Sequence, residues 1–316
     1  MICLGLDTSN YTTSAALYNS DTGSYASERQ LLPVAPGTLG LRQSDAVFHH
    51  TARLSGLIAA LFEKTPCRPD LVAVSVKPSE QEGSYMPCFS VGANVAYAIA
   101  AAMGVPVYAF SHQLGHIGAV LCSAKRADLV FSPFYAFHLS GGTTDALFVR
   151  PDEERLLAAT RLGGSSDLKA GQAIDRVGVM LGLPFPAGAA LDALAAKSAR
   201  TFRCRPFIKD LSCSFSGLQN QCERMLRQGD PKEDIAKYCL SYVCTALESL
   251  TDAMISADPD LPLVCSGGVS ANSMLWERFS SKYRCVFASD GLASDNAVGL
   301  AFLGAVKALR QNGGVS

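Results

Sequence analysis

The sequence predicts a duplicated α/β protein, with two related domains on either side of a cleft. Each half opens with an apolar strand, a turn of small residues and a returning strand. Apolar runs of strand length then alternate with long helical segments, which is typical of α/β architecture. The chain has 316 residues and is 48% hydrophobic, enough for two hydrophobic cores.

The first half is expected to start with a hairpin. An apolar strand ends at Asp7, and a hydroxyl-rich turn at residues 8–14 leads to the returning strand. Residues 71–76 are continuously apolar, so that strand should be buried on both faces. The expected elements are strands at residues 2–7, 15–18, 71–76 and 105–110 and helices at residues 46–64 and 91–103.

The second half repeats this order, beginning with another strand and a tight turn. Its expected elements are strands at residues 134–139, 146–149, 261–265 and 285–288 and helices at residues 166–182, 187–199, 231–256, from 272 onward and 293–311. We expect a first subdomain at residues 1–110, to which residues 293–316 return. A second subdomain with a helical insertion should span residues 111–292.

Charge and cysteine content narrow the function classes. The net charge of −1 argues against a strong autonomous nucleic-acid binder, so any RNA contact should be local or shared with a partner. The eleven cysteines include no CxxC pair and are expected to be reduced thiols. No apolar stretch is long enough to cross a membrane, and the first residues predict a strand. We therefore expect a cytoplasmic protein without a membrane partner.

His112 and His116 form the most informative pair. They lie four positions apart after an apolar strand, so on a helix both imidazoles leave the same face. Two such imidazoles can chelate a divalent metal ion, although HxxxH is short and also fits ordinary surface or core histidines. His49 and His50 are expected to be surface residues, since neighbours on a helix do not face each other.

Two glycine turns are candidates for binding phosphate groups. Residues 140–145 join two strands, and glycines there let a ligand approach the backbone N–H groups; an ordinary hairpin turn is the alternative. Residues 266–272 lie between a buried strand and a helix, where N–H groups and the helix dipole favour anions. Asn272 suits a ribose or base edge, or else only caps its helix. Neither turn matches a Rossmann or P-loop motif.

Three aspartates, Asp7, Asp175 and Asp295, end or interrupt apolar segments. Asp295 lies at the start of the last helix, where a carboxylate is stabilised by the helix dipole. Alternatively, it is a third metal ligand beside the two imidazoles, which would leave coordination positions open for substrate or water.

Seven segments together resemble the TsaD family, the threonylcarbamoyl transferases once catalogued as M22 glycoproteases. The segments occur in the family's order over nearly the whole chain. They are Leu4–Ser9, His112 with His116, Ser140–Gly142, Ala173–Arg176 with Leu181–Gly188, Ser214–Leu218, Gly267–Asn272 and Ser294–Asn296. The resemblance implies the duplicated actin-like, sugar-kinase and Hsp70 (ASKHA) ATPase fold.

The resemblance also implies a function and a site. The family moves a threonylcarbamoyl group from threonylcarbamoyl-AMP to N6 of the tRNA adenosine next to the anticodon. By position, His112, His116 and Asp295 would bind one iron or zinc ion. A pocket for ATP, ADP or an acyl-adenylate would be lined by His138, Leu139, Ser140, Gly141, Gly142, Asp175, Gly188 and Asn272. Partner proteins are expected to help with tRNA, and a homo- or heterodimer is conceivable.

The chain departs from the family at the first turn, so its catalytic residues are unknown. Tyr11 and Thr12 stand where the family has an acidic pair, and Thr143 replaces a histidine. The lost carboxylates could have oriented the incoming amine or taken its proton. The chain is therefore expected to be a divergent TsaD-like acyltransferase.

Three other functions stay open. The chain could bind nucleotide and metal but use another acceptor, or act as a non-catalytic partner in a complex. A metalloprotease is the weakest alternative, because Gln113 stands where HExxH has its general-base glutamate.

Overall fold

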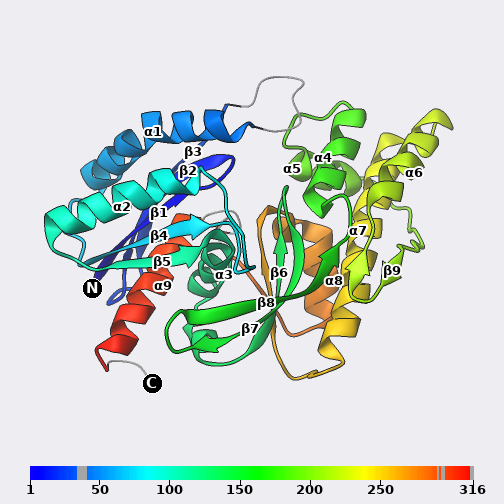
Figure 1. The fold of residues 1–316 in the computed structure, drawn as a ribbon. Helices are drawn as coiled ribbons and strands as arrows, with labels where there is room; N and C mark the ends of the chain where they lie inside the picture. Colours follow the sequence, from blue (N-terminus) through cyan, green and yellow to red (C-terminus); the bar gives the residue numbers. More distant parts are fainter. Residues whose placement is uncertain (34–40, 290–291, 293–295, 314–316) are drawn as a thin grey trace. The chain divides into compact units, whose positions relative to one another are not determined.

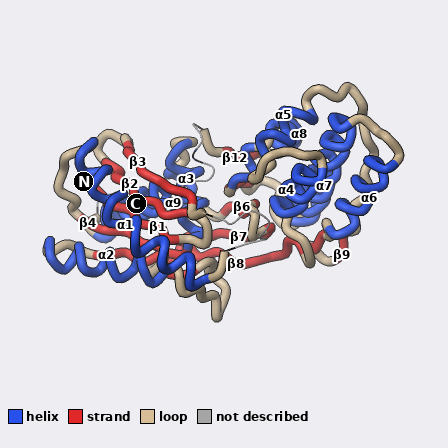
Figure 2. The backbone as a smooth tube through the Cα atoms, turned by 90° about the horizontal axis from the view of Figure 1, so that it is seen from above, coloured by secondary structure: helices blue, strands red, loops and turns tan. Residues whose placement is uncertain are grey.

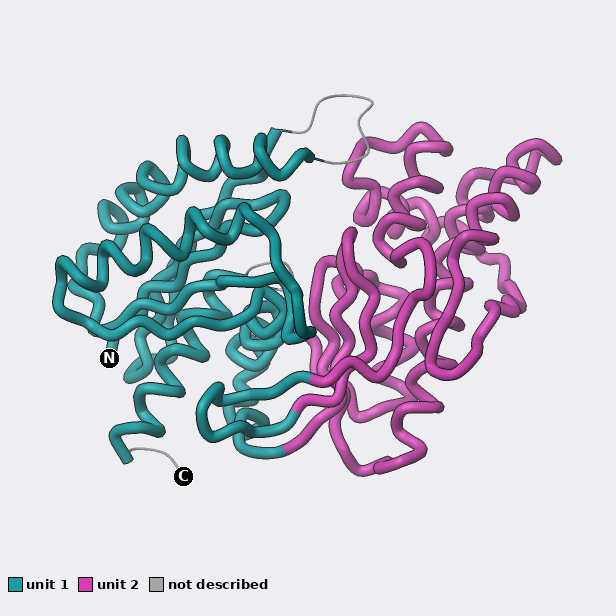
Figure 3. Tube along the Cα trace, in the orientation of Figure 1, with its two compact units in different colours: residues 1–132, 150–159, 289–316 teal, residues 133–149, 160–288 magenta. Residues whose placement is uncertain are grey.

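The computed structural model describes residues 1–33, 41–289, 292 and 296–313. The chain folds into two compact units (Figure 3). Unit 1 contains residues 1–132, 150–159 and 289–316, and unit 2 contains residues 133–149 and 160–288. Each unit has its own sheet and helices (Figure 1).

Unit 1 is built on a five-stranded sheet of order β3-β2-β1-β4-β5. Its strands are β1 (Ile2–Thr8), β2 (Thr12–Asn19), β3 (Tyr25–Leu31), β4 (Leu71–Lys77) and β5 (Val107–Ser111). The first three strands pair antiparallel as a meander, while β4 and β5 run parallel to β1. The carboxyl ends of β1, β4 and β5 therefore lie at one edge of the sheet, which brings Asp7, Ser75 and Ser111 to that edge.

Helices cover both faces of this sheet (Figure 2). On one face, α1 (Gln43–Lys64) and α2 (Phe89–Met103) cover alternate strand residues such as Leu4, Leu6 and Val72. On the other face, α9 (Asn296–Gln311) lies so close that a Cβ at Gly5 would come within 2.1 Å of the Ala297 carbonyl oxygen. Both faces being buried explains why β1 is apolar from Ile2 to Leu6 and β4 from Leu71 to Val74.

Helix α3 (His112–Ser123) packs directly on α9 along a seam of glycines. A Cβ at Gly299 would lie 1.9 Å from the Gly115 carbonyl oxygen, and one at Gly118 would lie 2.7 Å from the Gly299 carbonyl oxygen. Only glycine permits this approach of two backbones. The seam fixes α3, which begins at His112, against α9 within unit 1.

Unit 2 contains a seven-stranded sheet of order β12-β11-β6-β7-β8-β10-β9. Its strands are β6 (Phe134–Leu139), β7 (Thr144–Asp152), β8 (Leu156–Ser165), β9 (Ile208–Lys209), β10 (Ser212–Cys213), β11 (Leu263–Ser266) and β12 (Cys285–Phe287). Strand β6 pairs antiparallel with β7 and parallel with β11. A short 3₁₀ helix, η1 (Ala127–Phe131), precedes β6 in unit 1.

The helices of unit 2 form its main core against β6 and β11. They are α4 (Ala170–Met180), α5 (Gly188–Ala195), α6 (Ser216–Arg227), α7 (Lys232–Ile255) and α8 (Ser273–Lys282), with the 3₁₀ helix η2 (Gly268–Ala271) before α8. Apolar side chains of β6, such as Phe137, and of α7, such as Cys239 and Leu247, meet in this core.

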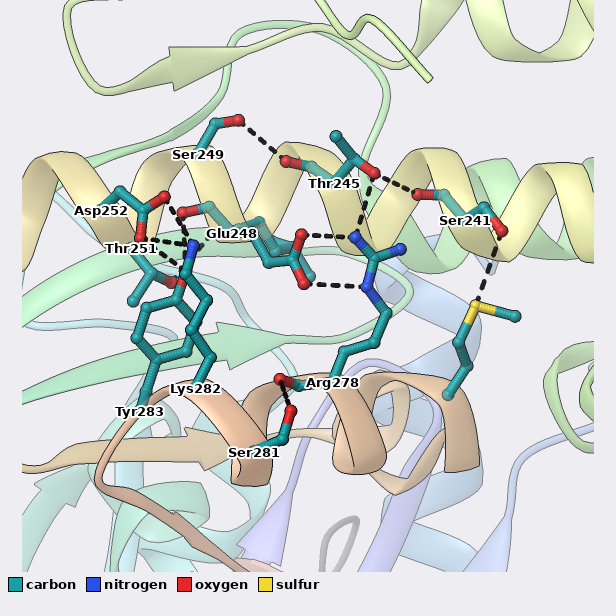
Figure 4. Close-up of polar contacts among 12 residues, drawn as sticks. Ser241, Thr245, Glu248, Ser249, Thr251, Asp252, Arg278, Ser281, Lys282 and Tyr283 are labelled. Atoms are coloured by element: carbon teal, nitrogen blue, oxygen red, sulfur yellow. Dashed lines mark hydrogen bonds and ion pairs between the residues drawn. The ribbon is translucent and has the colours of Figure 1, made fainter. Parts of the chain in front are cut away.

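A polar network joins α7 to α8 on one side of that core (Figure 4). The guanidinium of Arg278 makes a two-pronged ion pair with Glu248 and also donates to Thr245. One turn further along, Asp252 accepts from Lys282 and from the Tyr283 hydroxyl. Because these contacts hold α8 from several points, the start of α8 has a fixed position on unit 2.

Most expected elements are present, and several further ones were not predicted: the strands β3 and β8, the two-residue strands β9 and β10, the 3₁₀ helices η1 and η2, and helix α6. Strand β3 is an edge strand and α6 has a polar outer face, so neither shows the apolar pattern of a doubly buried element. The division into units also differs from the expected one. Helix α3 was placed with the second subdomain, but its packing on α9 makes residues up to 132 part of unit 1.

Two expectations from composition can be compared with the structure. Every cysteine is a free thiol, and Cys3, Cys88, Cys239, Cys244 and Cys265 are buried as expected. Among the helices of the described residues, none combines the length and apolar character needed to cross a membrane.

Candidate functional site

In unit 1, His112 lies against a buried carboxylate. Its Nδ1 atom is 2.9 Å from Oδ1 of Asp7, and the Ser75 hydroxyl donates to the same oxygen at 2.6 Å. The carboxylate is fully buried, which disfavours its charge; the charge and hydrogen bond of His112, with the hydroxyls, more than offset this and lower the pKa of Asp7. Asp7 therefore stays an anion that accepts a hydrogen bond from the Nδ1–H group of His112.

This hydrogen bond defines which nitrogen of His112 has a lone pair to offer. In the neutral imidazole with its proton on Nδ1, the Nε2 atom is an acceptor, and it lies 3.4 Å from the amide nitrogen of Asn296. A carboxylate on the far side of an imidazole is the arrangement that orients metal-ligating histidines. The donor set at His112 thus fits a metal ion bound through Nε2.

The second histidine follows one turn later on α3. The His116 ring centre lies 4.7 Å from that of His112, and the ring is almost completely buried. The two expected ligands are therefore neighbours on one helix face. Among the described residues, no group of three His, Cys, Asp or Glu side chains is placed to hold a metal ion, and Asp295 lies outside those residues.

The turn at residues 9–12, which contains Tyr11 and Thr12, is held by a buried histidine. His50 on α1 is 0% exposed; its Nε2 lies 2.7 Å from the Ser9 carbonyl oxygen and its Nδ1 2.7 Å from the Thr13 hydroxyl. Since a carbonyl only accepts, the proton is on Nε2 and Thr13 donates to Nδ1. The expectation of a surface position for His50 was wrong.

A second side chain from α1 holds the same turn from the other side. Gln43 donates to the Asn10 side chain at 2.6 Å and accepts from the Cys88 N–H at 3.4 Å. Thr12 is half-buried and Tyr11 is 38% exposed. The substituted turn is therefore an ordered part of unit 1, anchored to α1 and to the start of α2.

In unit 2, the glycine turn after β6 is packed against two other elements. The Ser140 N–H donates to the Thr143 carbonyl oxygen at 2.9 Å, which closes the turn. A Cβ at Gly171, in the first turn of α4, would lie 2.6 Å from the Ser140 carbonyl oxygen. At Gly141 and Gly142 a Cβ would meet no atom within 4 Å, so their outer side is open.

The second glycine turn lies beside the first. Gly267 has φ +88°, and a Cβ there would come within 2.3 Å of the Leu139 carbonyl oxygen. His138, the preceding residue of β6, is buried and pairs in register with Ser266. The two turns expected to bind phosphate groups are thus the adjacent ends of neighbouring parallel strands.

The other expected nucleotide-side residues are linked through α4, α5 and α8. The Asp175 carboxylate of α4 accepts from the Ala187 N–H at 2.7 Å, just before Gly188 opens α5. Burial raises the pKa of Asp175, against the effect of that hydrogen bond. Asp192 of α5 then holds the backbone N–H and hydroxyl of Ser273, both at 2.9 Å.

These contacts form a closed series that connects the residues of unit 2 expected to line the nucleotide pocket. Asn272 precedes Ser273 and caps α8 by accepting from the Leu275 N–H at 3.1 Å. The 3₁₀ helix η2 leads from Asn272 back to Gly267 and so to β6. The series runs through the turn after β6, α4, α5, the start of α8 and η2. Its open glycines, including Gly188 and Gly268, could accommodate a ligand.

Several residues of these sites were missed by sequence reasoning. Ser75 lies within an apolar strand and Thr13 in the hydroxyl-rich start of β2, and neither has a motif of its own. Thr144 accepts from the first N–H of α4 at 2.8 Å and so ties the glycine turn to that helix. His50 had a usable signal, because it shares one helix face with the buried residues Ala46, Leu54 and Leu61.

Comparison with known proteins agrees with this fold. The activator of 2-hydroxyisocaproyl-CoA dehydratase from Clostridium difficile, solved with bound ADPNP, has a TM-score of 0.57 and 13% identity, and the match covers 100% of this chain and 98% of that one. The fold is the duplicated ASKHA fold expected from the sequence.

Sequence relatives give the family. A protein of Aromatoleum aromaticum named tRNA N6-adenosine threonylcarbamoyltransferase is 31% identical over 334 residues, covering 99% of this chain and 94% of the relative. A probable bifunctional tRNA threonylcarbamoyladenosine biosynthesis protein of Thermoplasma volcanium is 28% identical, and the match covers 94% of this chain but only 53% of that protein. The sequence model of TsaD, tRNA N6-adenosine threonylcarbamoyltransferase, matches residues 37–302. The chain therefore belongs to the TsaD family.

Proposed function

We propose that this protein acts in tRNA threonylcarbamoyladenosine biosynthesis, as the transferase that moves a threonylcarbamoyl group from threonylcarbamoyl-AMP to N6 of the adenosine next to the anticodon. The observation that carries the proposal is the family match over residues 37–302, which spans both histidines and the glycine turns. Metal dependence, the acyl-adenylate donor and the tRNA acceptor are all parts of the proposal.

The reaction is an acyl transfer. The N6 nitrogen forms a C–N bond to the carbamate carbonyl carbon, the C–O bond to the AMP phosphate breaks, and N6 loses one proton. Such a reaction needs a stabilised carbonyl oxygen and an oriented amine. Iron or zinc, when bound, would supply Lewis-acid stabilisation of developing negative charge.

Residues of unit 1 would hold that metal ion. His112 and His116 would be two ligands and Asp295 the third. Asp7 would fix the ring of His112 through the Nδ1 hydrogen bond of 2.9 Å. The carboxylate would thus keep the Nε2 lone pair directed at the metal.

Residues of unit 2 would hold the adenylate. The N–H groups of the turns at Ser140–Gly142 and Gly267–Gly268 suit phosphate oxygens. Gly188 opens α5 where its N-terminal N–H groups are available, and Asp175 fixes that end through the Ala187 N–H. Asn272 would serve the ribose or base from its position at the start of α8.

The test is mass spectrometry of nucleosides from tRNA incubated with the protein, threonylcarbamoyl-AMP and metal, with and without the partner proteins used by relatives. We expect threonylcarbamoyladenosine with the wild type, its loss with His112→Ala, and no loss with His49→Ala, which removes a partly exposed histidine of α1. If the wild type forms no modified nucleoside under any of these conditions, the proposed function is wrong.

A further inference from the structure

The segment that leads into β9 carries an unusual concentration of positive charge. Residues 200–209 contain four cations, Arg200, Arg203, Arg205 and Lys209, and no carboxylate. Arg200 is neutralised by Asp230 at 3.2 Å and Asp234 at 3.4 Å. For the other three cations, the described part of the chain provides no ion pair. A protein of net charge −1 thus has three unneutralised cations within seven residues.

The packing of this segment turns those cations outward. From 202 to 209, even-numbered residues are partly buried and odd-numbered residues are exposed. The Phe202 ring packs on Tyr238 of α7 at 5.5 Å, and Ile208 packs on the core of unit 2. A period of two is typical of an extended chain with one face anchored. Arg203, Arg205 and Lys209 therefore share the face that points to water.

An exposed aromatic ring stands among these cations. Phe207 is 65% exposed, although its backbone is fixed, because its carbonyl oxygen accepts from the Ser214 N–H at 3.2 Å. The neighbouring β9 is the edge strand of the seven-stranded sheet, so no further strand covers this side (Figure 1). Phe207 is therefore an exposed aromatic ring on a fixed backbone, and it offers an apolar stacking surface next to positively charged side chains.

We propose that Arg203, Arg205, Phe207 and Lys209, here named the β9 strip, bind a single-stranded segment of RNA. The cations would neutralise backbone phosphates, and Phe207 would stack on an unpaired base. An acidic polypeptide would satisfy the cations but would leave the aromatic stacking surface unused, so RNA is the better match. That the natural RNA is tRNA rests on the proposed function.

The experiment is fluorescence anisotropy of the full chain with a labelled unpaired oligoribonucleotide and with tRNA, over a range of salt concentrations and without metal or acyl-adenylate. Arg203→Gln with Arg205→Gln should weaken binding about tenfold or more and lower the slope of log K against log salt by about 1.4. Phe207→Ser should weaken binding of the unpaired RNA about tenfold with the slope unchanged.

A matched control removes two cations elsewhere. Lys125→Gln with Arg150→Gln, at two exposed cations of unit 1, changes the net charge by the same amount and should bind RNA like the wild type. Both double variants should unfold at the same urea concentration as the wild type, since all four side chains are on the surface. The inference is overturned if the strip variant binds RNA like this control, or if polyglutamate binds and RNA does not.

Failure of the strip and failure of the proposed function can be told apart. Binding is measured without catalysis, so a protein that binds RNA through the strip but forms no threonylcarbamoyladenosine refutes only the transferase proposal. A protein that forms the nucleoside, and whose strip variants bind and modify tRNA normally, refutes only the strip.

Discussion

Asp7 Oδ1 lies 2.9 Å from His112 Nδ1, so the first strand of the chain sets the orientation of an imidazole 105 positions later. The contact exists because β1 and β5 are parallel strands of one sheet that end at the same edge, with β4 between them. An imidazole at the end of β5 could otherwise rotate freely about its Cα–Cβ bond. The buried carboxylate selects one rotamer and one tautomer.

Asp7→Asn is expected to lower zinc affinity about tenfold, because a neutral amide raises ligand basicity less than a carboxylate does. Affinity can be measured by competition with a chelating dye. Ser75→Ala, which removes only the second hydrogen bond to Asp7, should lower it less. Equal affinity of wild type and Asp7→Asn would mean that the pair has no part in metal binding.

The glycine seam between α3 and α9 predicts a large cost for a small substitution. Gly299→Ala would place a methyl group 1.9 Å from the Gly115 carbonyl oxygen, so the two helices must separate. We expect the free energy of unfolding to fall by about 3 kcal/mol, measured by urea titration.

Gly56→Ala is the matched control for that variant. Gly56 also lies within a helix, α1, but an added Cβ there meets no atom within 4 Å. This variant should gain about 0.5–1 kcal/mol from the better helix propensity of alanine. If both substitutions have the same effect, the close approach of α3 and α9 does not occur in solution.

His50 predicts a loss of stability in mild acid. Burial lowers the pKa of His50, against the raising effects of the Ser9 carbonyl and of Asp7, from an ordinary value of 6.5. As the pH falls below 6.5, the unfolded chain takes up a proton that the folded protein does not, so folding is weakened until the folded pKa is reached. The urea midpoint of the wild type should therefore drop between neutral pH and mild acid.

His50→Gln should remove that part of the pH dependence while lowering stability at neutral pH by about 1–3 kcal/mol, because buried partners lose hydrogen bonds. Thr13→Val, which leaves the imidazole in place, should keep the pH dependence. Parallel pH profiles of wild type and His50→Gln would show that the buried imidazole is not the titrating group.

Asp167 predicts an effect at lower pH. Burial opposes its charge, but hydrogen bonds from Ser214, from the Phe215 N–H and from Ser216 lower the pKa of Asp167 to about 2. Because the folded protein lowers the pKa of this carboxyl group, the ionised carboxylate stabilises the fold at pH values above 3.8, the ordinary pKa. This stabilisation is lost as the pH falls toward about 2.

Asp167→Asn should therefore cost about 1 kcal/mol at neutral pH, as for other caps at a helix start, and flatten the acid limb of the stability curve. Thermal unfolding between neutral pH and pH of about 2 would measure this. Glu153→Gln, at an exposed carboxylate of the β7–β8 turn, is the comparison variant and should leave the curve unchanged. A steep acid limb in Asp167→Asn would contradict the assignment.

The helices and strands that could be predicted from the sequence are those in which buried residues follow a continuous or periodic pattern. Strand β4 and helix α7 show continuous or periodic apolar residues, so their positions followed from hydrophobic pattern alone. Strand β3 has mostly polar residues because none of its side chains is buried, and its pattern resembles that of a loop.

The site is harder to predict, because its contacts join distant positions. Asp192 and Ser273 are 81 positions apart, and neither belongs to a motif, yet together they hold the start of α8 against α5. The role of Asp7 likewise depends on strand order in the sheet, which no local pattern encodes. The glycine turns were recognisable because a turn needs glycine at a defined place, whatever the partner.

The position of α9 has a consequence for how the chain is made. The strands of unit 1 leave the ribosome before unit 2 does, but α9, which covers β1 and the glycines of α3, is encoded at residues 296–311. Unit 2 is complete in sequence by residue 288. During translation, then, unit 2 can fold while the first sheet still exposes an apolar face, and β1, although it is made before unit 2, is buried by α9 only after unit 2 has been made.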